Sequence, residues 1–272
     1  MTHKQLADLL RVEPGHAAGL AGRDPGDRLG FADKEAGLVR MGELVDRISL
    51  LHNRLRAEGQ RSLLIVFQGL DASGKDGTIN HVFTGISPQG CRVVSFRQPT
   101  EPELAHDYLW RIHAQCPARG ELVIFNRSHY EDVVAARVRE LVPKRVWSKR
   151  YRHLREFERL LAEEGTTLVK VFLNLSKEEQ GKRLQERLDD PEKAWKFRLD
   201  DLADRARWGE FIEAYEDAIT ETSTDWAPWH VVPADHNWVR NLAVAEIVAG
   251  TLECLDPKLP APDPSLHDVR VI

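Results

Sequence analysis

One segment of the sequence has the residue types and spacing of a phosphate-binding loop. Gly69, Gly74 and Lys75 fall in the pattern Gly-x-x-x-x-Gly-Lys, directly after the apolar run LLIVF and directly before a helical pattern. Glycines let backbone N–H groups turn toward phosphate oxygens, a helix start adds positive potential, and a lysine supplies a point charge. A plain glycine turn is the simpler alternative. The expected phosphate ligands are Gly69, Ser73, Gly74, Lys75, Asp76 and Gly77.

Two acidic residues in this loop depart from what an anion site requires. Asp76 stands where a Ser or Thr ordinarily helps to hold Mg²⁺, so the metal must be bound in a different way from that of the usual loop. Asp71 suits a loop in which a divalent ion lies between carboxylate and phosphate, or in which the carboxylate orients an acceptor. A turn-forming aspartate is the alternative. We predict that Asp71 holds the metal, with Mg²⁺ as the cofactor and Mn²⁺ as a second candidate.

A second polar segment begins where the apolar run of residues 122–125 ends. In open α/β sheets, ligands bind at the carboxyl ends of the strands. Asn126 occupies the position at which an acidic metal-holding residue is expected, and Arg127, Glu131 and Asp132 follow closely. A capped helix start is the alternative, and both interpretations are compatible. We interpret His129 as a surface or structural histidine rather than a catalytic one.

Two later segments contain clustered cations. Residues 144–155 carry six basic residues and no acid, which suits a channel for a long anion but equally a subunit interface or a solvated helix face. Residues 182–208 carry eight basic and seven acidic residues, and this composition alone favours a solvated helical hairpin. Because P-loop enzymes often fold a basic lid over the transferred phosphate, we predict a lid at residues 182–208.

Short apolar runs alternate with helical patterns along the chain, which predicts an α/β fold with a parallel sheet covered on both faces. The expected strands are residues 62–67, 92–96, 122–125, 168–175 and 230–232. The expected helices are residues 34–57, a segment from 75, and residues 101–115, 145–164, 176–188, 208–221 and 238–254. Residues 1–32 lack a sustained period and are expected to form an arm that wraps the domain or stays mobile, before a single domain over residues 33–272.

Composition argues against several classes of binding partner and favours one cellular compartment. Lys and Arg number 38 against 43 Asp and Glu, a net charge of −5, which argues against nucleic acid and against a polybasic membrane binder. The three cysteines lie far apart and form no Cys-x-x-Cys pair, which favours a reducing compartment. The first residues contain no apolar segment of a signal peptide, and no apolar run approaches the ~18 residues of a membrane span. We therefore expect a cytoplasmic protein.

Five segments in order resemble the family-2 polyphosphate kinases, P-loop enzymes that phosphorylate nucleotides with inorganic polyphosphate. They are GLDASGKDGT, FNRSHYEDV, LVPKRVWSKRY, RLDDPEKAWKF and APWHVVPADHNW, and the resemblance spans residues 34–255. It implies a fold like thymidylate kinase, with a five-stranded parallel sheet flanked by helices and a helical lid. It also implies a homo-oligomer, either a dimer or a tetramer.

The resemblance also implies roles for single residues. Lys75 and Arg127 would neutralise the transferred phosphoryl group, and Asp71 would hold Mg²⁺ or align the acceptor, so these three are the implied catalytic residues. The implied polyphosphate ligands are Lys149, Arg150, Arg183, Arg187 and Lys196, and the implied nucleotide ligands are Asn126, Glu131 and Asp132. The second motif reads Asn-Arg-Ser-His-Tyr-Glu where the family often has Asp-Arg-Ser, which resembles the subgroup that accepts AMP as well as ADP.

The implied reaction is a reversible, Mg²⁺-dependent phosphoryl transfer from polyphosphate to AMP and ADP, with guanine nucleotides as further candidate acceptors. One alternative is a nucleoside monophosphate kinase that uses ATP. Asp76 and the basic residues 144–155 favour polyphosphate over ATP. Another alternative is a regulator that binds nucleotide or polyphosphate without turnover. The presence of both Asp71 and Lys75 favours catalysis.

Overall fold

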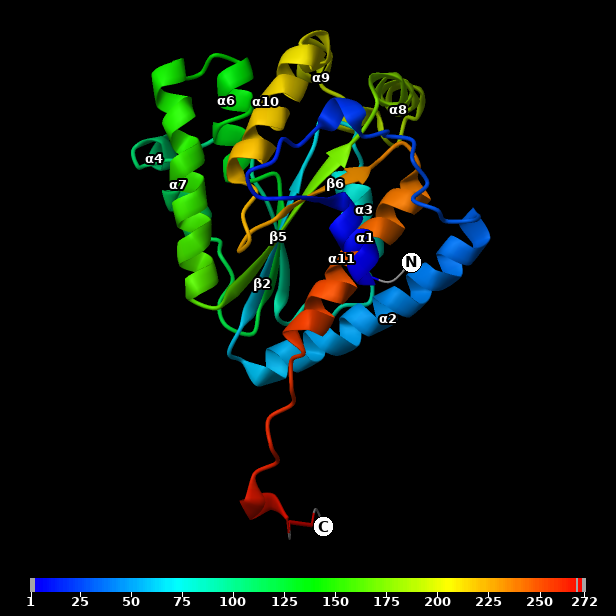
Figure 1. Ribbon diagram of the computed structural model, residues 1–272, viewed down its shortest axis with the longest axis vertical. Coiled ribbons are helices and arrows are strands. Elements are labelled where there is room, and N and C mark those ends of the chain that lie inside the picture. The colour runs from blue at the N-terminus through cyan, green and yellow to red at the C-terminus, as the bar shows by residue number, and fades with distance from the viewer. Residues whose placement is uncertain (1–2, 268, 271–272) are drawn as a thin grey trace.

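The computed structural model, which describes residues 3–267, 269 and 270, has one mixed sheet with helices on both faces (Figure 1). The strand order is β1-β6-β5-β2-β4-β3, and β2 to β6 pair in parallel. The strands are β1 (Arg11–Val12), β2 (Ser62–Gln68), β3 (Cys91–Ser95), β4 (Leu122–Asn126), β5 (Thr166–Asn174) and β6 (Trp229–Pro233).

The five predicted parallel strands are present, but the prediction of a five-stranded sheet was one strand short. The additional strand β1 pairs antiparallel with β6, where Arg11 lies opposite His230 and Val12 opposite Trp229. Two residues are too few to produce an alternating pattern, so this edge strand has no signature in the sequence.

Two groups of helices cover the sheet. One face carries α1 (His3–Leu10), α2 (Lys34–Glu58), α3 (Lys75–Val82) and α11 (Asn237–Leu255), and the other carries α6 (Ala135–Val138), α7 (Lys144–Glu163) and α10 (Trp208–Thr222) (Figure 1). The helices α8 (Lys177–Asp189) and α9 (Leu199–Ala206) lie at the carboxyl edge of the strands. The strands β2, β4, β5 and β6 are buried over most of their length, whereas β3 is partly exposed at the edge of the sheet. The core lies in two apolar layers, one on each side of the sheet.

Local signals explain several helix boundaries. Asp33 caps α2 by accepting a hydrogen bond from Ala36 N, and Gly59 ends that helix in the left-handed conformation. Ser176 caps α8, as its position three residues before Glu179 predicts.

The prediction of one helix over residues 101–115 is wrong. The structure has two short helices instead, α4 (Glu101–Leu104) and α5 (Trp110–His113). Between them the Asp107 carboxylate accepts a hydrogen bond from Leu109 N, a local turn that competes with helical hydrogen bonding.

The described part of the first 32 residues packs against the domain. α1 lies on α11, with Leu6 and Leu10 in the same apolar layer as that helix. Further along, the Glu216 carboxylate on α10 accepts hydrogen bonds from Gly19 N and Leu20 N, each at 2.8 Å. None of the described helices is long and apolar enough to cross a membrane.

Candidate active site

The phosphate-binding loop lies between β2 and α3 at the carboxyl edge of the sheet. Gly69 and Gly74 adopt φ angles of 150° and 97°, which favour glycine, and a Cβ on Gly74 would overlap the guanidinium of Arg240. Lys75 Nζ donates to the carbonyl oxygens of Gly69 at 2.6 Å and Leu70 at 3.1 Å. Burial, together with nearby Arg127, lowers the pKa of Lys75 to about 8.

Two arginines hold the outside of this loop. Arg183 on α8 donates to the carbonyl oxygens of Ala72 and Ser73, at 3.2 and 3.4 Å, and to those of Ala234 and Asp235, both at 2.8 Å. Arg240 on α11 donates to Ser73 O at 3.1 Å. The guanidinium of Arg183 therefore binds loop carbonyl groups and positions the loop, and its role as a phosphate ligand stays a prediction.

Arg240 was not among the site residues predicted from the sequence. Burial, with nearby Arg183, lowers the pKa of Arg240 to about 9. Its sequence signal is slight, since it is the one Arg or Lys in the otherwise apolar helical pattern of residues 237–255.

The second polar segment meets the loop through Arg127. This residue has φ of 62°, in the left-handed region, and its guanidinium forms ion pairs with Asp71 on one side and with Glu131 at 3.2 Å on the other. Glu131 and Asp71 raise the pKa of Arg127 well above its ordinary value. Burial alone would raise the pKa of Asp71, but Arg127 and Lys75 together hold it below its ordinary value.

The other residues of this segment have separate surroundings. Asn126 Nδ2 donates to Asp76 Oδ1 at 2.6 Å, so the end of β4 contacts the first turn of α3. Asp132 points to Arg150, 3.5 Å away, and to Arg111, 4.0 Å away, and does not line the cavity beside Glu131. Burial raises the pKa of Asp132.

His129 is buried, which excludes the surface alternative and fits a structural histidine. Its Nε2 lies 3.1 Å from Glu158 Oε1, and Glu158 Oε2 accepts from Lys170 Nζ at 2.6 Å. Tyr130 Oη also donates to Glu158 Oε1, at 2.7 Å. This buried network anchors the segment that carries Arg127 and Glu131 to α7 and β5.

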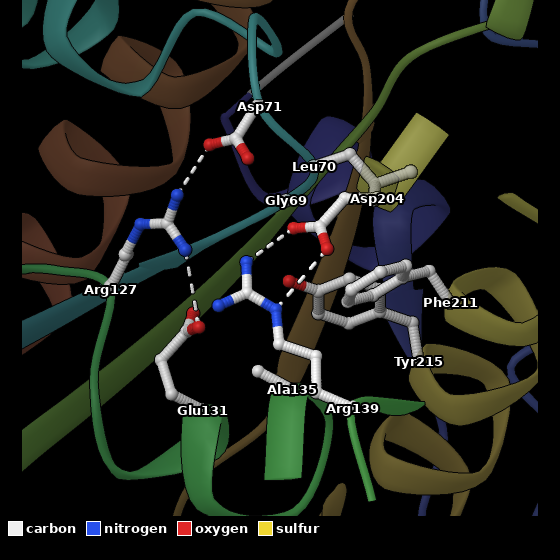
Figure 2. Close-up of a pocket in the computed structure, with 10 residues that line it drawn as sticks. All are labelled: Gly69, Leu70, Asp71, Arg127, Glu131, Ala135, Arg139, Asp204, Phe211 and Tyr215. Carbon is white, nitrogen blue, oxygen red and sulfur yellow. Dashed lines mark hydrogen bonds and ion pairs between the residues drawn. The ribbon is translucent and has the colours of Figure 1, made fainter. Parts of the chain in front are cut away.

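A small cavity of about 10 Å³ lies between these segments and the lid (Figure 2). Its wall includes Asp71, Arg127 and Glu131, and on the far side Arg139 and Asp204, which form an ion pair. Gln68 lies behind this wall; with its amide oriented to satisfy all its neighbours, its Nε2 donates to Glu131 Oε1 at 3.1 Å and to Tyr215 Oη at 3.2 Å. These contacts join residues far apart in the sequence, so no sequence pattern predicted the four residues Gln68, Arg139, Asp204 and Tyr215.

The remaining predicted polyphosphate ligands are spread over the lid and α7. Lys149 is exposed, whereas Arg150 donates to Asp132 O at 2.7 Å and stacks on the Tyr108 ring. Arg187 lies 3.8 Å from Asp201, and Lys196 lies over the Trp195 ring. The structure does not gather these side chains around the cavity. The first residues of α7 nevertheless lie at the same end of the molecule as α6 and α9 (Figure 1).

The loop carboxylates have the right chemistry for Mg²⁺. This ion prefers hard oxygen ligands and is commonly held by one or two carboxylates together with substrate phosphates and water. Asp71 has a lowered pKa and is ionised at neutral pH, and Asp76 is a second carboxylate of the loop. Within the described part of the chain, no three His, Cys, Asp or Glu side chains form a metal cluster by themselves. The donor set fits Mg²⁺ bound together with a phosphate substrate.

A phosphate loop at the strand ends, facing the partly buried Arg127 and a helical lid, defines the chain as a P-loop kinase. Residues 32–260 match the family model "Polyphosphate kinase 2 (PPK2)". The AMP/ADP-polyphosphate phosphotransferase of Meiothermus ruber is 57% identical over 96% of this chain and 98% of its own. The ADP-polyphosphate phosphotransferase of Rhodopseudomonas palustris is 45% identical over 81% of each chain.

A solved structure agrees with these sequence matches. Polyphosphate kinase 2 from Arthrobacter aurescens TC1 superposes with a TM-score of 0.91 at 41% identity, over 98% of this chain and 93% of that one. The chain belongs to the polyphosphate kinase 2 family, and the resemblance seen in the sequence is confirmed.

Proposed function

We propose that the chain transfers a phosphoryl group from inorganic polyphosphate to AMP and to ADP, forming ADP and ATP. The observation that carries this proposal is the ion-pair chain Asp71–Arg127–Glu131, which joins the phosphate loop to the second segment. A carboxylate at the position of Glu131 is the feature that resembles the AMP-accepting subgroup. The relative named an AMP/ADP-polyphosphate phosphotransferase, 57% identical over almost the whole chain, supports the same acceptors.

In this proposal the protein acts by positioning and charge rather than by a covalent intermediate. Phosphoryl transfer requires neutralised charge and in-line alignment of donor and acceptor. Lys75 and Arg127 supply two cations beside the loop, and Arg183 and Arg240 keep the loop in shape from outside. Bound Mg²⁺ supplies further neutralisation of the transferring phosphate. We assign Asp71 as its protein ligand.

We assign the acceptor side to Glu131 and Asn126. Glu131 is held by Arg127 and by the Gln68 amide, and Asn126 is held by Asp76. Residues 182–208 would act as the lid, and the exposed cations at the start of α7, including Lys149, would lead polyphosphate toward it. Asp132 and Arg150 bind each other and would support this surface rather than touch substrate.

An acceptor and donor panel tests the proposal. Purified protein is incubated with Mg²⁺ and AMP, ADP, GMP or GDP, with either polyphosphate or ATP as the donor, and the products are separated by ion-exchange chromatography. We expect ADP and ATP from AMP with polyphosphate. Reaction with ATP alone would favour the nucleoside monophosphate kinase alternative, and binding without turnover would favour the regulator.

Lys75→Ala is the matched control for the panel. Loss of a preorganised charge-stabilising donor costs about 10²- to 10³-fold in turnover. A folded Lys75→Ala protein with near-normal activity would show that the loop does not take part in the reaction.

A further inference from the structure

The lid helix α9 has its polarity inverted. Two of its three aspartates, Asp201 and Asp204, are buried, with 6% and 9% of their surface exposed, whereas Leu199 and Leu202 are 80% and 47% exposed. A helix on a protein surface ordinarily buries its apolar side chains and exposes its charges. Buried carboxylates are costly unless they are paired, so the buried face of α9 must meet cations.

Two arginines supply this charge, and one of them, Arg139, lines the active-site cavity. Asp204 accepts from Arg139 through both oxygens, with Nε to Oδ1 at 3.2 Å and Nη2 to Oδ2 at 2.5 Å. Asp201, one helical turn earlier, lies 3.8 Å from Arg187. The lid thus places two carboxylates against two guanidinium groups.

Arg139 and Arg127 line the same cavity, with Glu131 between them (Figure 2). With α9 in this position the cavity measures about 10 Å³, far below the ~300 Å³ or more of a site that accommodates a small ligand. Entry of a nucleotide therefore requires α9 to move, and movement of α9 separates Asp204 from Arg139. An arginine that loses its carboxylate in a partly buried site needs another anion, and the guanidinium fork suits phosphate as well as carboxylate.

We propose that Arg139 binds the phosphate group of the acceptor nucleotide, and that Asp204 occupies the same guanidinium when α9 covers the cavity. The inference rests on the proposed function, because it takes the nucleotide as the ligand of this cavity. It adds a phosphate ligand outside the loop and a lid carboxylate that competes with substrate for it. When the lid opens and the acceptor binds, the acceptor phosphate then replaces the Asp204 carboxylate at Arg139.

Two variants break the ion pair between Arg139 and Asp204. Together they distinguish phosphate binding by Arg139 from an ion pair that only holds the lid closed. Asp204→Asn removes the competing charge and leaves Arg139 available, whereas Arg139→Gln removes the ligand itself. Dissociation constants for AMP and for adenosine are measured by calorimetry on the whole protein without polyphosphate. We expect Asp204→Asn to bind AMP several-fold more tightly. We expect Arg139→Gln to bind AMP about 10- to 100-fold more weakly, the size of one charge-assisted hydrogen bond, with adenosine binding unchanged.

The controls distinguish this inference from the proposed function. Arg159→Gln removes an exposed arginine that pairs with Glu163 on α7, and it should leave both constants unchanged. Thermal unfolding of each variant checks the fold, and Asp204→Asn tests the proposal even if Arg139→Gln fails to fold. AMP affinity that changes in the same direction in both variants, or a loss of adenosine binding equal to that of AMP, would overturn the inference. Wild-type protein that binds no AMP would instead contradict the proposed function.

Discussion

The lowered pKa of Lys75 predicts an alkaline limit to polyphosphate use. Lys75 Nζ is buried against two loop carbonyl groups, and burial lowers its pKa to about 8. The protonated ammonium is the form that binds phosphate, so the active form predominates below this pKa and is lost above it. With a pKa near 8, the charged fraction falls from about nine-tenths at pH 7 to about one-tenth at pH 9.

This change has a specific kinetic signature. Because kcat/KM reports the free enzyme, kcat/KM for polyphosphate should fall about tenfold between pH 7 and pH 9. In the complex, the negative phosphates favour the charged ammonium, so kcat at saturating polyphosphate should change much less over this interval. The assay is initial-rate ADP formation at saturating AMP, with polyphosphate varied at each pH and at constant ionic strength.

The variant Lys75→Arg is the matched control. A guanidinium stays charged across this range, although its different shape lowers the overall rate. Its residual activity should therefore show no decline between pH 7 and pH 9. A flat wild-type profile of kcat/KM, or a decline that persists in Lys75→Arg, would refute the assignment of the limit to Lys75.

Three further perturbations follow from named contacts. Asp71→Asn removes the charge assigned to the metal and should lower turnover at least about 10²-fold while the protein stays folded, as thermal unfolding would show. An unaltered rate and Mg²⁺ dependence would mean that Asp71 serves only as a turn residue. Lys149→Gln should reduce the slope of log affinity for polyphosphate against log salt by about 1, with AMP affinity as the control, and an unchanged slope would mean that this side chain faces only water. Glu158→Gln should destabilise the protein by about 3–5 kcal/mol in denaturant unfolding, because it leaves the Lys170 ammonium buried without its carboxylate. Adding Lys170→Met should recover part of that loss, and strictly additive effects would contradict the coupling.

The elements that could be predicted are those with a local signal. The phosphate loop consists of nine consecutive residues, and each parallel strand is an apolar run between helical patterns. Both could therefore be recognised from neighbouring residues in the sequence. The helix break at Asp107 escaped prediction because one side-chain hydrogen bond decided it. The strand β1 escaped because its two residues gain their structure from β6.

The partners of charged side chains could not be predicted in the same way. Arg183 and Arg187 stand four residues apart on one helix, yet Arg183 binds loop carbonyl groups and Arg187 faces a lid carboxylate. The near-neutral charge of residues 182–208 suggested a solvated segment, but two of its aspartates, Asp201 and Asp204, are buried and pair with Arg187 and Arg139. Charge counts do not record which pairs the fold brings together, and the pairing of Arg139 with Asp204 spans 65 residues.

The origin of the transferred phosphate tests the central claim most directly. Polyphosphate, AMP, Mg²⁺ and the protein are followed together by ³¹P nuclear magnetic resonance, with Lys75→Ala as the inactive control. We predict that the signal of internal polyphosphate groups declines while the β-phosphate signal of ADP rises in the same amount, before ATP signals follow. An unchanged polyphosphate signal, or ADP formed only when ATP is supplied, would contradict the account.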